Sequence, residues 1–374
     1  MATYNFNTTG STEYLPVNLS ASEEITFHVT NSNEGSSYFT IETYPDNNGA
    51  YSSNAPKNAS GSYVSSSGIT TITSDDYHMS AVVENGGGTI TFAPANFVSG
   101  SDLKVRGVGA KIDYSSIIDR WPNAAVAYSL RRLNSYYDGP AVKVRRSVDN
   151  EEKDINFIGT FLDTTTLETF CSGGDGFVTT WYDQSGNGYD ATTTVAVRQP
   201  QIVSIGTVIK ENGKPVVKFD GSNDQLVSVF GTTYAQPTYF FLTHNFHSTP
   251  AAFDAVVGSI SVENRLILDS SLNYTLQAGG ALAYSAYSPS QSLASYKIQK
   301  SDPKFFFNGV QQSVTGGTSI GTSGLEGVIL GGVASGSATG TTPIQIQEFI
   351  AYGRDQDSNR TGIESNINSY YNIY

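Results

Sequence analysis

The chain has 374 residues and a formal net charge of −13 at pH 7, and only 15% of its residues are charged. Proteins that bind nucleic acid or anionic lipid electrostatically need an excess of Lys and Arg to neutralise the phosphates, so this composition excludes both as principal partners. The 37 Gly, 23 Tyr and 19 Phe residues indicate instead a strand-rich and turn-rich protein, and the length favours two or three domains.

The single cysteine and the first residues bear on where the protein is made. Cys171 has no second cysteine with which to form an intrachain disulfide. The start, Met-Ala-Thr-Tyr-Asn-Phe-Asn, has neither the basic region nor the apolar core of a signal peptide, and no run of about 18 apolar residues occurs. We therefore expect synthesis in a cytoplasm and no membrane insertion.

Residues 1–113 predict a small β-sandwich, which we interpret as an anchoring or docking domain. Short segments rich in β-branched and aromatic residues alternate there with Asn, Ser and Gly turns, and no helical period occurs. We find no catalytic constellation among them, because His28 and His78 have no partner at ligand spacing. The strands are expected at residues 24–30, 37–42, 68–73, 78–83, 89–92 and 103–107.

The second domain, residues 114–374, is predicted to open with a helix. The segment from Asp119 would begin it, because Pro122 is tolerated in the first turn of a helix. Arg131 and Arg132 fall off the apolar face of that helix, and we expect them to be solvated or paired with carboxylates of the acidic surface. The apolar face would consist of Val126, Leu130, Leu133 and Tyr137.

The next predicted strand, Phe177–Tyr182, is dense in aromatic and β-branched residues and runs into Asp183–Gly188, where turn-forming residues follow one another. Short helices are expected at Asp163–Phe170, where Thr165 and Glu168 have capping-box spacing, and at Asp357–Tyr371. Between residues 202 and 349 strands and turns alternate, which is typical of a jelly roll.

Five motifs lie close together in the first half of this domain. They are Ala127-Tyr-Ser-Leu-Arg-Arg, Tyr137-Asp-Gly-Pro, Val144-Arg-Arg-Ser, Phe170-Cys and Trp181-Tyr-Asp-Gln-Ser-Gly-Asn-Gly. Together they resemble the catalytic domain of the α-L-arabinofuranosidase B family, a concanavalin-A-like jelly roll. The resemblance covers residues 120–225, and the closing strand, turn and helix are similar to the end of laminin-G-like domains. The expected fold class is therefore all-β, with a small N-terminal β-sandwich, a concanavalin-A-like jelly roll and a few short helices.

The resemblance implies retaining glycoside hydrolysis, which needs two carboxyl groups about 5 Å apart. The family's nucleophile is a Glu in a Gly-Asn-Ala-Glu type of turn. Gly258 and Ser259 match the start of that turn, but Ser261 stands where the Glu should be. Glu263 lies two residues further along a strand, about 7 Å away, which is too far for attack on the same anomeric carbon. We therefore predict that the protein is not an enzyme and has no catalytic residues.

The family's disulfides are missing as well. Cys171 matches the first half of one of them, but Gly176 stands at the position of its partner. The adjacent pair of cysteines that lines the family's sugar pocket is absent. The resemblance thus implies a protein that keeps the family's fold but lacks its nucleophile and its disulfides.

The loop after Phe177–Tyr182 supplies the candidate glycan-binding residues. Aromatic side chains can stack on a sugar ring and polar ones can bond its hydroxyls, although alternation along a strand places either Trp181 or Tyr182 in the core. The five candidates are Trp181, Tyr182, Asp183, Asn187 and Tyr189.

No metal or other cofactor is expected. Asp183, Ser185 and Asn187 have the spacing of half a calcium loop, but Thr194 replaces the Glu at its twelfth position, so an Asx-type turn is preferred to a Ca²⁺ site. His244 and His247 are three residues apart and have no third zinc ligand nearby.

Three functions remain open. The first is a virion surface protein of a bacteriophage, of the fibre, tail or decoration type. It would be assembled in the host cytoplasm as a homo-oligomer, with its first domain bound to other virion proteins and its second to a host glycan. The second is a glycoside hydrolase, an arabinofuranosidase or polysaccharide depolymerase, that recruits Asp254, Glu263 or Asp269. The third is an architectural protein that binds nothing.

Overall fold

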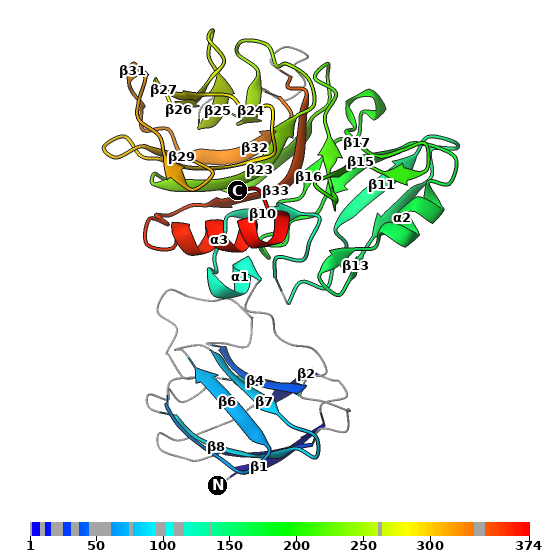
Figure 1. Cartoon of the computed structure of the whole chain (residues 1–374), viewed down its shortest axis with the longest axis vertical. Coiled ribbons are helices and arrows are strands. Elements are labelled where there is room, and N and C mark those ends of the chain that lie inside the picture. Colours follow the sequence, from blue (N-terminus) through cyan, green and yellow to red (C-terminus); the bar gives the residue numbers. More distant parts are fainter. Residues whose placement is uncertain are drawn as a thin grey trace. The chain divides into compact units, whose positions relative to one another are not determined.

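The computed structural model describes residues 2–7, 12–15, 25–30, 37–44, 61–74, 78–94, 102–107, 116–134, 136–260, 264–332 and 341–374. The chain divides into two compact units, Met1–Asp113 and Tyr114–Tyr374, and each is described by itself. Strands are the main secondary structure of both units, with a few short helices in the second (Figure 1). The predicted all-β fold class is confirmed.

The described part of the first unit consists of two sheets. One has the strand order β1-β3-β8-β5 and the other β2-β9-β4-β7-β6. All six predicted strands are present, whereas β1, β2 and β5 were not predicted. The strands are β1 (Ala2–Asn7), β2 (Thr12–Leu15), β3 (Ile25–Thr30), β4 (Ser37–Tyr44), β5 (Gly61–Ser65), β6 (Ile69–Ser74), β7 (His78–Val83), β8 (Gly88–Pro94) and β9 (Asp102–Gly107).

Side chains from both sheets of this unit form a common core, which includes Phe27, Phe39, Met79 and Phe92. Apolar residues on alternate positions of each strand supply it, as expected for a sandwich. His28 lies on the exposed face of β3, and its Nδ1 is 3.0 Å from Oγ1 of Thr89 on the neighbouring strand.

In the second unit, the described strands pair antiparallel into one sheet that closes on itself. The sheet contains β10 (Val126–Ser129), β11 (Val142–Arg146), β12 (Glu152–Ile155), β15 (Gly176–Trp181), β16 (Ala191–Thr192), β17 (Gln201–Ser204), β18 (Thr207–Val208), β21 (Val217–Lys218), β22 (Leu226–Tyr234), β23 (Thr238–Phe246), β24 (Ala255–Gly258), β25 (Arg265–Leu268), β26 (Asn273–Gln277), β27 (Ala281–Ala286), β28 (Ser292–Ile298), β29 (Lys304–Phe307), β30 (Val310–Gln311), β31 (Gly316–Ser319), β32 (Leu325–Leu330) and β33 (Ile344–Tyr352). Two separate hairpins are formed by β13 (Phe157–Ile158) with β14 (Phe161–Leu162), and by β19 (Lys210–Glu211) with β20 (Lys214–Pro215).

The centre of this unit is the pair β23 and β33, in which every residue is buried. Side chains of β23 point alternately to two layers. Tyr239 and Phe241 pack with Ile363 and Ile367 of helix α3 (Arg360–Tyr371), and Phe240 packs in the main core on the other face. Figure 1 shows α3 lying along this sheet. The closing helix predicted from the sequence is confirmed.

The predicted opening helix is wrong for most of its length. Helix α1 covers only Ile117–Arg120, and residues 126–129 form strand β10, paired with β33. The residue before a proline is disfavoured in helical geometry, so the helix ends at Arg120, and Trp121, directly before Pro122, is its C-cap. Strand β10 is buried on both faces, and its Val126, with Leu130 and Leu133 beyond the strand, also fits the spacing of a helical stripe.

The short helix α2 (Thr164–Phe170) is present where predicted, but its cap differs. Asp163, not Thr165, is the N-cap, and its carboxylate accepts the N–H of Thr166 at 2.9 Å. Oε1 of Glu168 instead accepts the N–H of Val208 at 3.1 Å. No helix in the described part of the chain is both long and apolar enough to span a bilayer.

Candidate functional site

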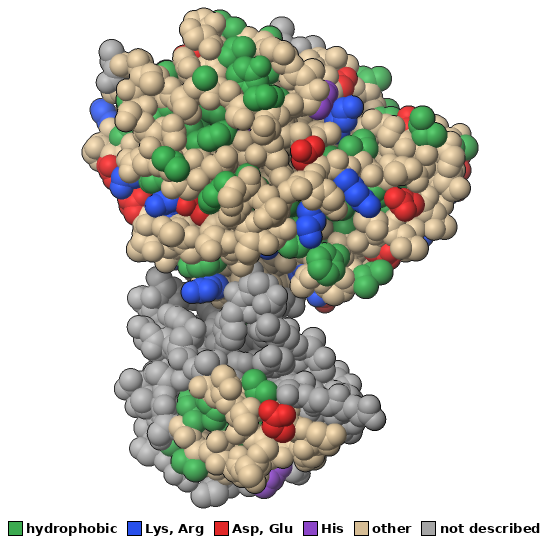
Figure 2. All heavy atoms as spheres, in the orientation of Figure 1, with side chains coloured by type: hydrophobic (Ala, Val, Ile, Leu, Met, Phe, Trp, Pro, Cys, Tyr) green, Lys and Arg blue, Asp and Glu red, His purple; other side chains and the backbone are tan. Residues whose placement is uncertain are grey.

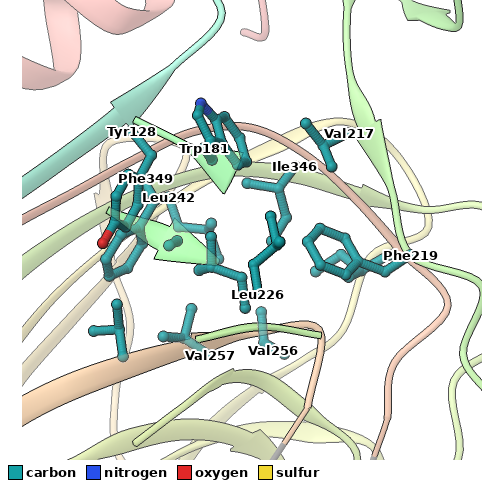
Figure 3. Close-up of a cluster of buried hydrophobic side chains, with 14 of the residues drawn as sticks. Tyr128, Trp181, Val217, Phe219, Leu226, Leu242, Val256, Val257, Ile346 and Phe349 are labelled. Carbon is teal, nitrogen blue, oxygen red and sulfur yellow. The ribbon is translucent and has the colours of Figure 1, made fainter. Parts of the chain in front are cut away.

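Strand β15 leads into the loop that carries the candidate residues, and its last residue belongs to the core. Trp181 has no exposed surface, and its ring centroid lies 6.0 Å from that of Tyr128. Figure 3 shows both rings among buried side chains. The prediction that Trp181 binds a glycan is therefore wrong, because a ring without exposed surface cannot stack on a sugar. The prediction that either Trp181 or Tyr182 lies in the core is confirmed.

Asp183 is a structural residue, because all its acceptor capacity is used inside the protein. Oδ1 accepts the N–H groups of Ala127 and Ser185, each at 2.9 Å. Oδ2 accepts the hydroxyl of Ser185 at 2.7 Å and the N–H of Tyr189 at 3.1 Å. Burial raises the pKa of this carboxyl group, although the four hydrogen bonds oppose that rise. The preference for an Asx-type turn over a calcium loop agrees with this geometry, whereas direct glycan contact by Asp183 does not.

Gln184 joins the same loop to the segment after β10. Its Nε2 donates to the carbonyl oxygens of Ser129 and Arg131, at 3.1 and 3.0 Å, and its Oε1 accepts the N–H of Leu133 at 2.7 Å. Gln184 is fully buried, so each bond satisfies a backbone group that water cannot reach. Sequence reasoning missed this role.

Asn187 continues the connection at the exposed end of the loop. Its Nδ2 donates to the carbonyl oxygens of Ala124 and Ala125, at 2.9 and 3.0 Å. We call Asp183, Gln184 and Asn187 the loop staple, because they fasten the loop to residues 124–133. The staple explains why two motifs some 50 residues apart occur together in the sequence.

The arginine motif serves a second structural purpose. Arg131, predicted to be solvated or salt-bridged, is 5% exposed and forms two hydrogen bonds with Glu348 of β33, at 2.7 and 2.9 Å. Glu348 also accepts the hydroxyls of Ser129 and Tyr371, at 2.8 and 3.2 Å. The buried carboxylate of Glu348 is thus paired with a cation and accepts four hydrogen bonds.

Partly exposed tyrosines remain around the staple. The hydroxyl of Tyr182 donates to Asp154 at 2.7 Å, and that of Tyr137 donates to the carbonyl oxygen of Pro140 at 2.8 Å. Burial, and then the carboxylates Asp154 and Asp190, raise the pKa of both phenols. These tyrosines therefore stay neutral, and Tyr182 offers a ring and a hydroxyl beside a carboxylate acceptor. Such a surface can bind sugar hydroxyls and the apolar face of a sugar ring.

Tyr189 follows Gly188 at the end of the loop and is partly exposed. Its ring stacks on Phe230 of β22, with centroids 4.8 Å apart. Its carbonyl oxygen accepts the hydroxyls of Tyr128 and Ser228, the latter at 2.8 Å.

The carboxylates of the hydrolase alternative lie in turns of their own. Asp254 is buried and accepts the N–H of Ala251 at 2.7 Å, and burial raises its pKa. Burial alone would also raise the pKa of Asp269, but hydrogen bonds from Asn273 and Ser271 outweigh it and lower that pKa. Glu263 and Ser261 lie outside the described residues.

The disulfide position implied by the resemblance is visible in the packing. Cys171 is a free, buried cysteine, and a Cβ added at Gly176 would lie 2.7 Å from its Sγ. The two residues therefore face each other as disulfide partners would. Burial raises the pKa of the Cys171 thiol to about 11, so the thiol stays protonated and unreactive.

The described residues contain no cluster of three or more His, Cys, Asp or Glu side chains that suits a metal ion. His244 and His247 each have a hydrogen-bond partner instead. Nε2 of His244 lies 2.8 Å from the hydroxyl of Tyr274, and Nε2 of His247 lies 2.8 Å from the carbonyl oxygen of Phe219.

Comparisons with known proteins agree with this geometry. The family model described as α-L-arabinofuranosidase B, catalytic, matches residues 119–223, which include the whole loop staple but end before Asp254. No curated protein matches the chain in sequence. The resemblance to this catalytic domain is confirmed.

Solved structures similar to this chain include three arabinofuranosidases. They are a GH54 α-L-arabinofuranosidase soaked with a cyclic sulfate inhibitor (17% identity, TM-score 0.51), an arabinofuranosidase complexed with arabinofuranosyl-α-1,2-xylobiose (18%, 0.50), and a mutant GH54 α-L-arabinofuranosidase soaked with 4-nitrophenyl α-L-arabinofuranoside (16%, 0.50). Each alignment covers 67% of this chain and 64% of the other chain. At these identities the likeness shows a shared fold, that of an arabinofuranosidase-like jelly roll.

Proposed function

We propose that the second unit is a glycan-binding module without hydrolytic activity. This proposal rests on one observation, which is that the residues of the loop staple serve to hold the fold together. The residues that match the family hold the fold together. The resemblance implies, in addition, that Ser261 stands where the family has its glutamate. The loop staple therefore stabilises the fold whether or not the protein catalyses a reaction.

The binding surface that we propose is formed by Tyr182, Tyr137 and Tyr189, with Asp154 as a hydrogen-bond acceptor. Their rings are partly exposed, and Tyr182 is fixed by its bond to Asp154. A preordered aromatic surface loses little side-chain entropy when it binds. Asn187 keeps its place in the proposal as a neighbour on the exposed end of the loop.

The biological setting that we propose is the surface of a bacteriophage particle, assembled in the host cytoplasm. The first unit would bind other virion proteins, and the second would bind a glycan of the host. Several copies on one particle would turn weak individual binding into strong attachment. The small first sandwich and the acidic, sparsely charged composition support this setting.

A glycoside hydrolase is the second candidate, and the state of Asp254 favours it. A buried carboxyl group with a raised pKa is what a general acid requires. The hydrolase would also need a second carboxylate facing Asp254, and Asp269 is engaged by its own turn.

The test is a glycan array probed with the full chain and with Tyr182→Ala. Tyr182→Phe is the matched control, because it keeps the ring and loses only the bond to Asp154. We expect the wild type to bind, Tyr182→Ala to lose at least tenfold in affinity, and Tyr182→Phe to lose less. If no glycan binds the wild type, or if Tyr182→Ala binds equally well, the proposed surface is wrong.

A further inference from the structure

A second surface of this unit combines aromatic rings with a basic side chain and uses none of the proposed glycan-binding tyrosines. It is formed by the hairpin β13–β14, the hairpin β19–β20 and the end of helix α3. In the register of the first hairpin, Ile158 is paired with Phe161, so both side chains lie on one face. They are 62% and 54% exposed, whereas Phe157 and Leu162 on the opposite face are buried in the core. Figure 2 shows hydrophobic side chains gathered in this region, with Lys and Arg side chains beside them.

The exposed ring of Phe161 continues onto Tyr370 of α3. The two ring centroids are 6.2 Å apart and the planes are inclined by 25°. Nζ of Lys214 lies 4.2 Å from the centroid of Tyr370 and 5.6 Å from that of Phe161. The ammonium group is therefore placed against two rings, where cation–π attraction holds it.

The backbone around Lys214 is fixed from two sides. Nε2 of Gln347, in β33, donates to the carbonyl oxygens of Glu211 and Lys214, each at 3.2 Å. Nδ2 of Asn212, in the turn of the same hairpin, donates to the carbonyl oxygen of Tyr371 at 2.8 Å. The hairpin is thus anchored both to the central strand and to the end of α3, so Lys214 has a defined position.

The charge at this surface is not balanced internally. Arg131, which lies 4.7 Å from the centroid of Tyr370, is neutralised by Glu348. Lys214 forms no ion pair and donates no side-chain hydrogen bond within the part of the chain that the structure describes, although Glu211 is its neighbour in the β19–β20 register. In a protein with 34 acidic and 21 basic residues, Lys214 is thus a cation without an internal counter-charge, placed beside the exposed ring of Phe161 and the half-buried ring of Tyr370.

We infer that Phe161, Tyr370 and Lys214 form a second glycan subsite, which binds sugar rings that carry a carboxylate group. The exposed aromatic face suits the apolar face of a sugar ring, and the ammonium group suits its carboxylate. One ammonium group matches one carboxylate, whereas phosphate sites in proteins use several N–H donors or a helix N-terminus. This inference deepens the proposed function and rests on it, since it specifies an acidic polysaccharide as the bound glycan.

The test is calorimetric titration of the full chain with oligogalacturonate, oligoalginate and hyaluronan fragments. The methyl-esterified oligogalacturonate is the neutral counterpart, because it keeps the sugar and removes the charge. The variants are Phe161→Ala and Lys214→Ala. Lys153→Ala is the matched control, because Lys153 also lies over an aromatic ring, 5.9 Å from the centroid of Phe170, but on another surface. Tryptophan fluorescence would confirm that each variant is folded.

We expect at least one acidic glycan to bind at least tenfold more tightly than the neutral counterpart. Phe161→Ala and Lys214→Ala should each lose tenfold or more, and Lys153→Ala should bind like the wild type. The inference is overturned if acidic and neutral glycans bind equally, or if Lys214→Ala leaves acidic binding unchanged. If Lys214→Ala binds acidic glycans normally but Tyr182→Ala does not, the proposed function stands without this subsite. If the wild type binds no glycan, both the proposed function and this subsite are wrong.

Discussion

The carboxylate of Asp183 accepts the backbone N–H of Ala127 at 2.9 Å, across 56 positions of the sequence. Ala127 lies in strand β10, next to the central strand β33, so this bond ties the loop directly to the middle of the sheet. With the bonds of Gln184 and Asn187 it makes the loop part of the core. The residues that most resemble the arabinofuranosidase family therefore contribute mainly to the stability of the fold.

The first prediction concerns Asp183. Asp183→Ala would leave the N–H groups of Ala127, Ser185 and Tyr189 without their acceptor, and each buried unsatisfied group costs about 1–3 kcal/mol. We expect the free energy of unfolding to fall by roughly 3 kcal/mol or more. Urea titration followed by tryptophan fluorescence measures it, since both tryptophans, Trp121 and Trp181, lie in the second unit.

The control for this prediction is Asp149→Ala. Asp149 forms an exposed ion pair with Arg146 at 2.6 Å, and exposed pairs contribute at most about 1 kcal/mol. Equal losses in the two variants would show that Asp183 has no special structural role.

The second prediction concerns the pair of Arg131 and Glu348. Arg131→Met would leave the carboxylate of Glu348 buried without a counter-charge, and we expect a loss of roughly 3–5 kcal/mol. Adding Glu348→Gln removes the charge but keeps an acceptor for Ser129 and Tyr371. The double variant should therefore lose less than the sum of the two single losses, and additive losses would contradict the coupling.

The third prediction concerns Gly176. Because a Cβ at this position would lie 2.7 Å from Sγ of Cys171, Gly176→Cys should form a disulfide after oxidation. Thiol titration of the denatured protein should find one free thiol in the wild type and none in the oxidised variant. Gly176→Val is the steric control. Since Val144 and Val203 would each lie 3.1 Å from the added Cβ, it should destabilise the fold. Two titratable thiols in oxidised Gly176→Cys would show that the positions do not face each other.

The fourth prediction concerns pH. Burial raises the pKa of Asp224 to about 7, with its carboxylate accepting the N–H of Asp220 at 2.9 Å. The folded state then binds a proton that the unfolded state has already lost, so stability falls as the pH rises from about 4 to 7. The effect is at most roughly 4 kcal/mol.

Asp224→Asn removes this titration and keeps an acceptor for Asp220. Unfolding measured at pH 5 and pH 8 should therefore show a smaller loss of stability with rising pH in Asp224→Asn than in the wild type. The same pH dependence in both proteins would contradict the raised pKa.

Local patterns were sufficient for much of the fold. Strands and turns alternate between residues 202 and 349 as predicted, and Asn308 and Gly309, which follow β29, both have the positive φ of a tight turn. The prediction failed at β10, because Val126, Leu130, Leu133 and Tyr137 fit a period of 3.6 although the chain is extended at residues 126–129. Pro122 was the signal against a helix there.

The site was harder to predict, because its residues act across long separations. Trp181 and Tyr182 are equivalent in the sequence, and only the strand's orientation decides which ring is exposed. Gln184 has no local feature that shows its bonds to residues 129–133. The pairing of Arg131 with Glu348 spans 217 positions, so no sequence window contains both partners.

The most direct test of our account measures binding and turnover on the same samples. The wild type and Asp254→Asn would be titrated with arabinofuranosyl-bearing and acidic polysaccharides, and release of 4-nitrophenol from 4-nitrophenyl α-L-arabinofuranoside would be followed in parallel. We predict saturable glycan binding by both proteins and no turnover above the rate in buffer. Turnover by the wild type that Asp254→Asn abolishes would contradict the account and identify a glycoside hydrolase.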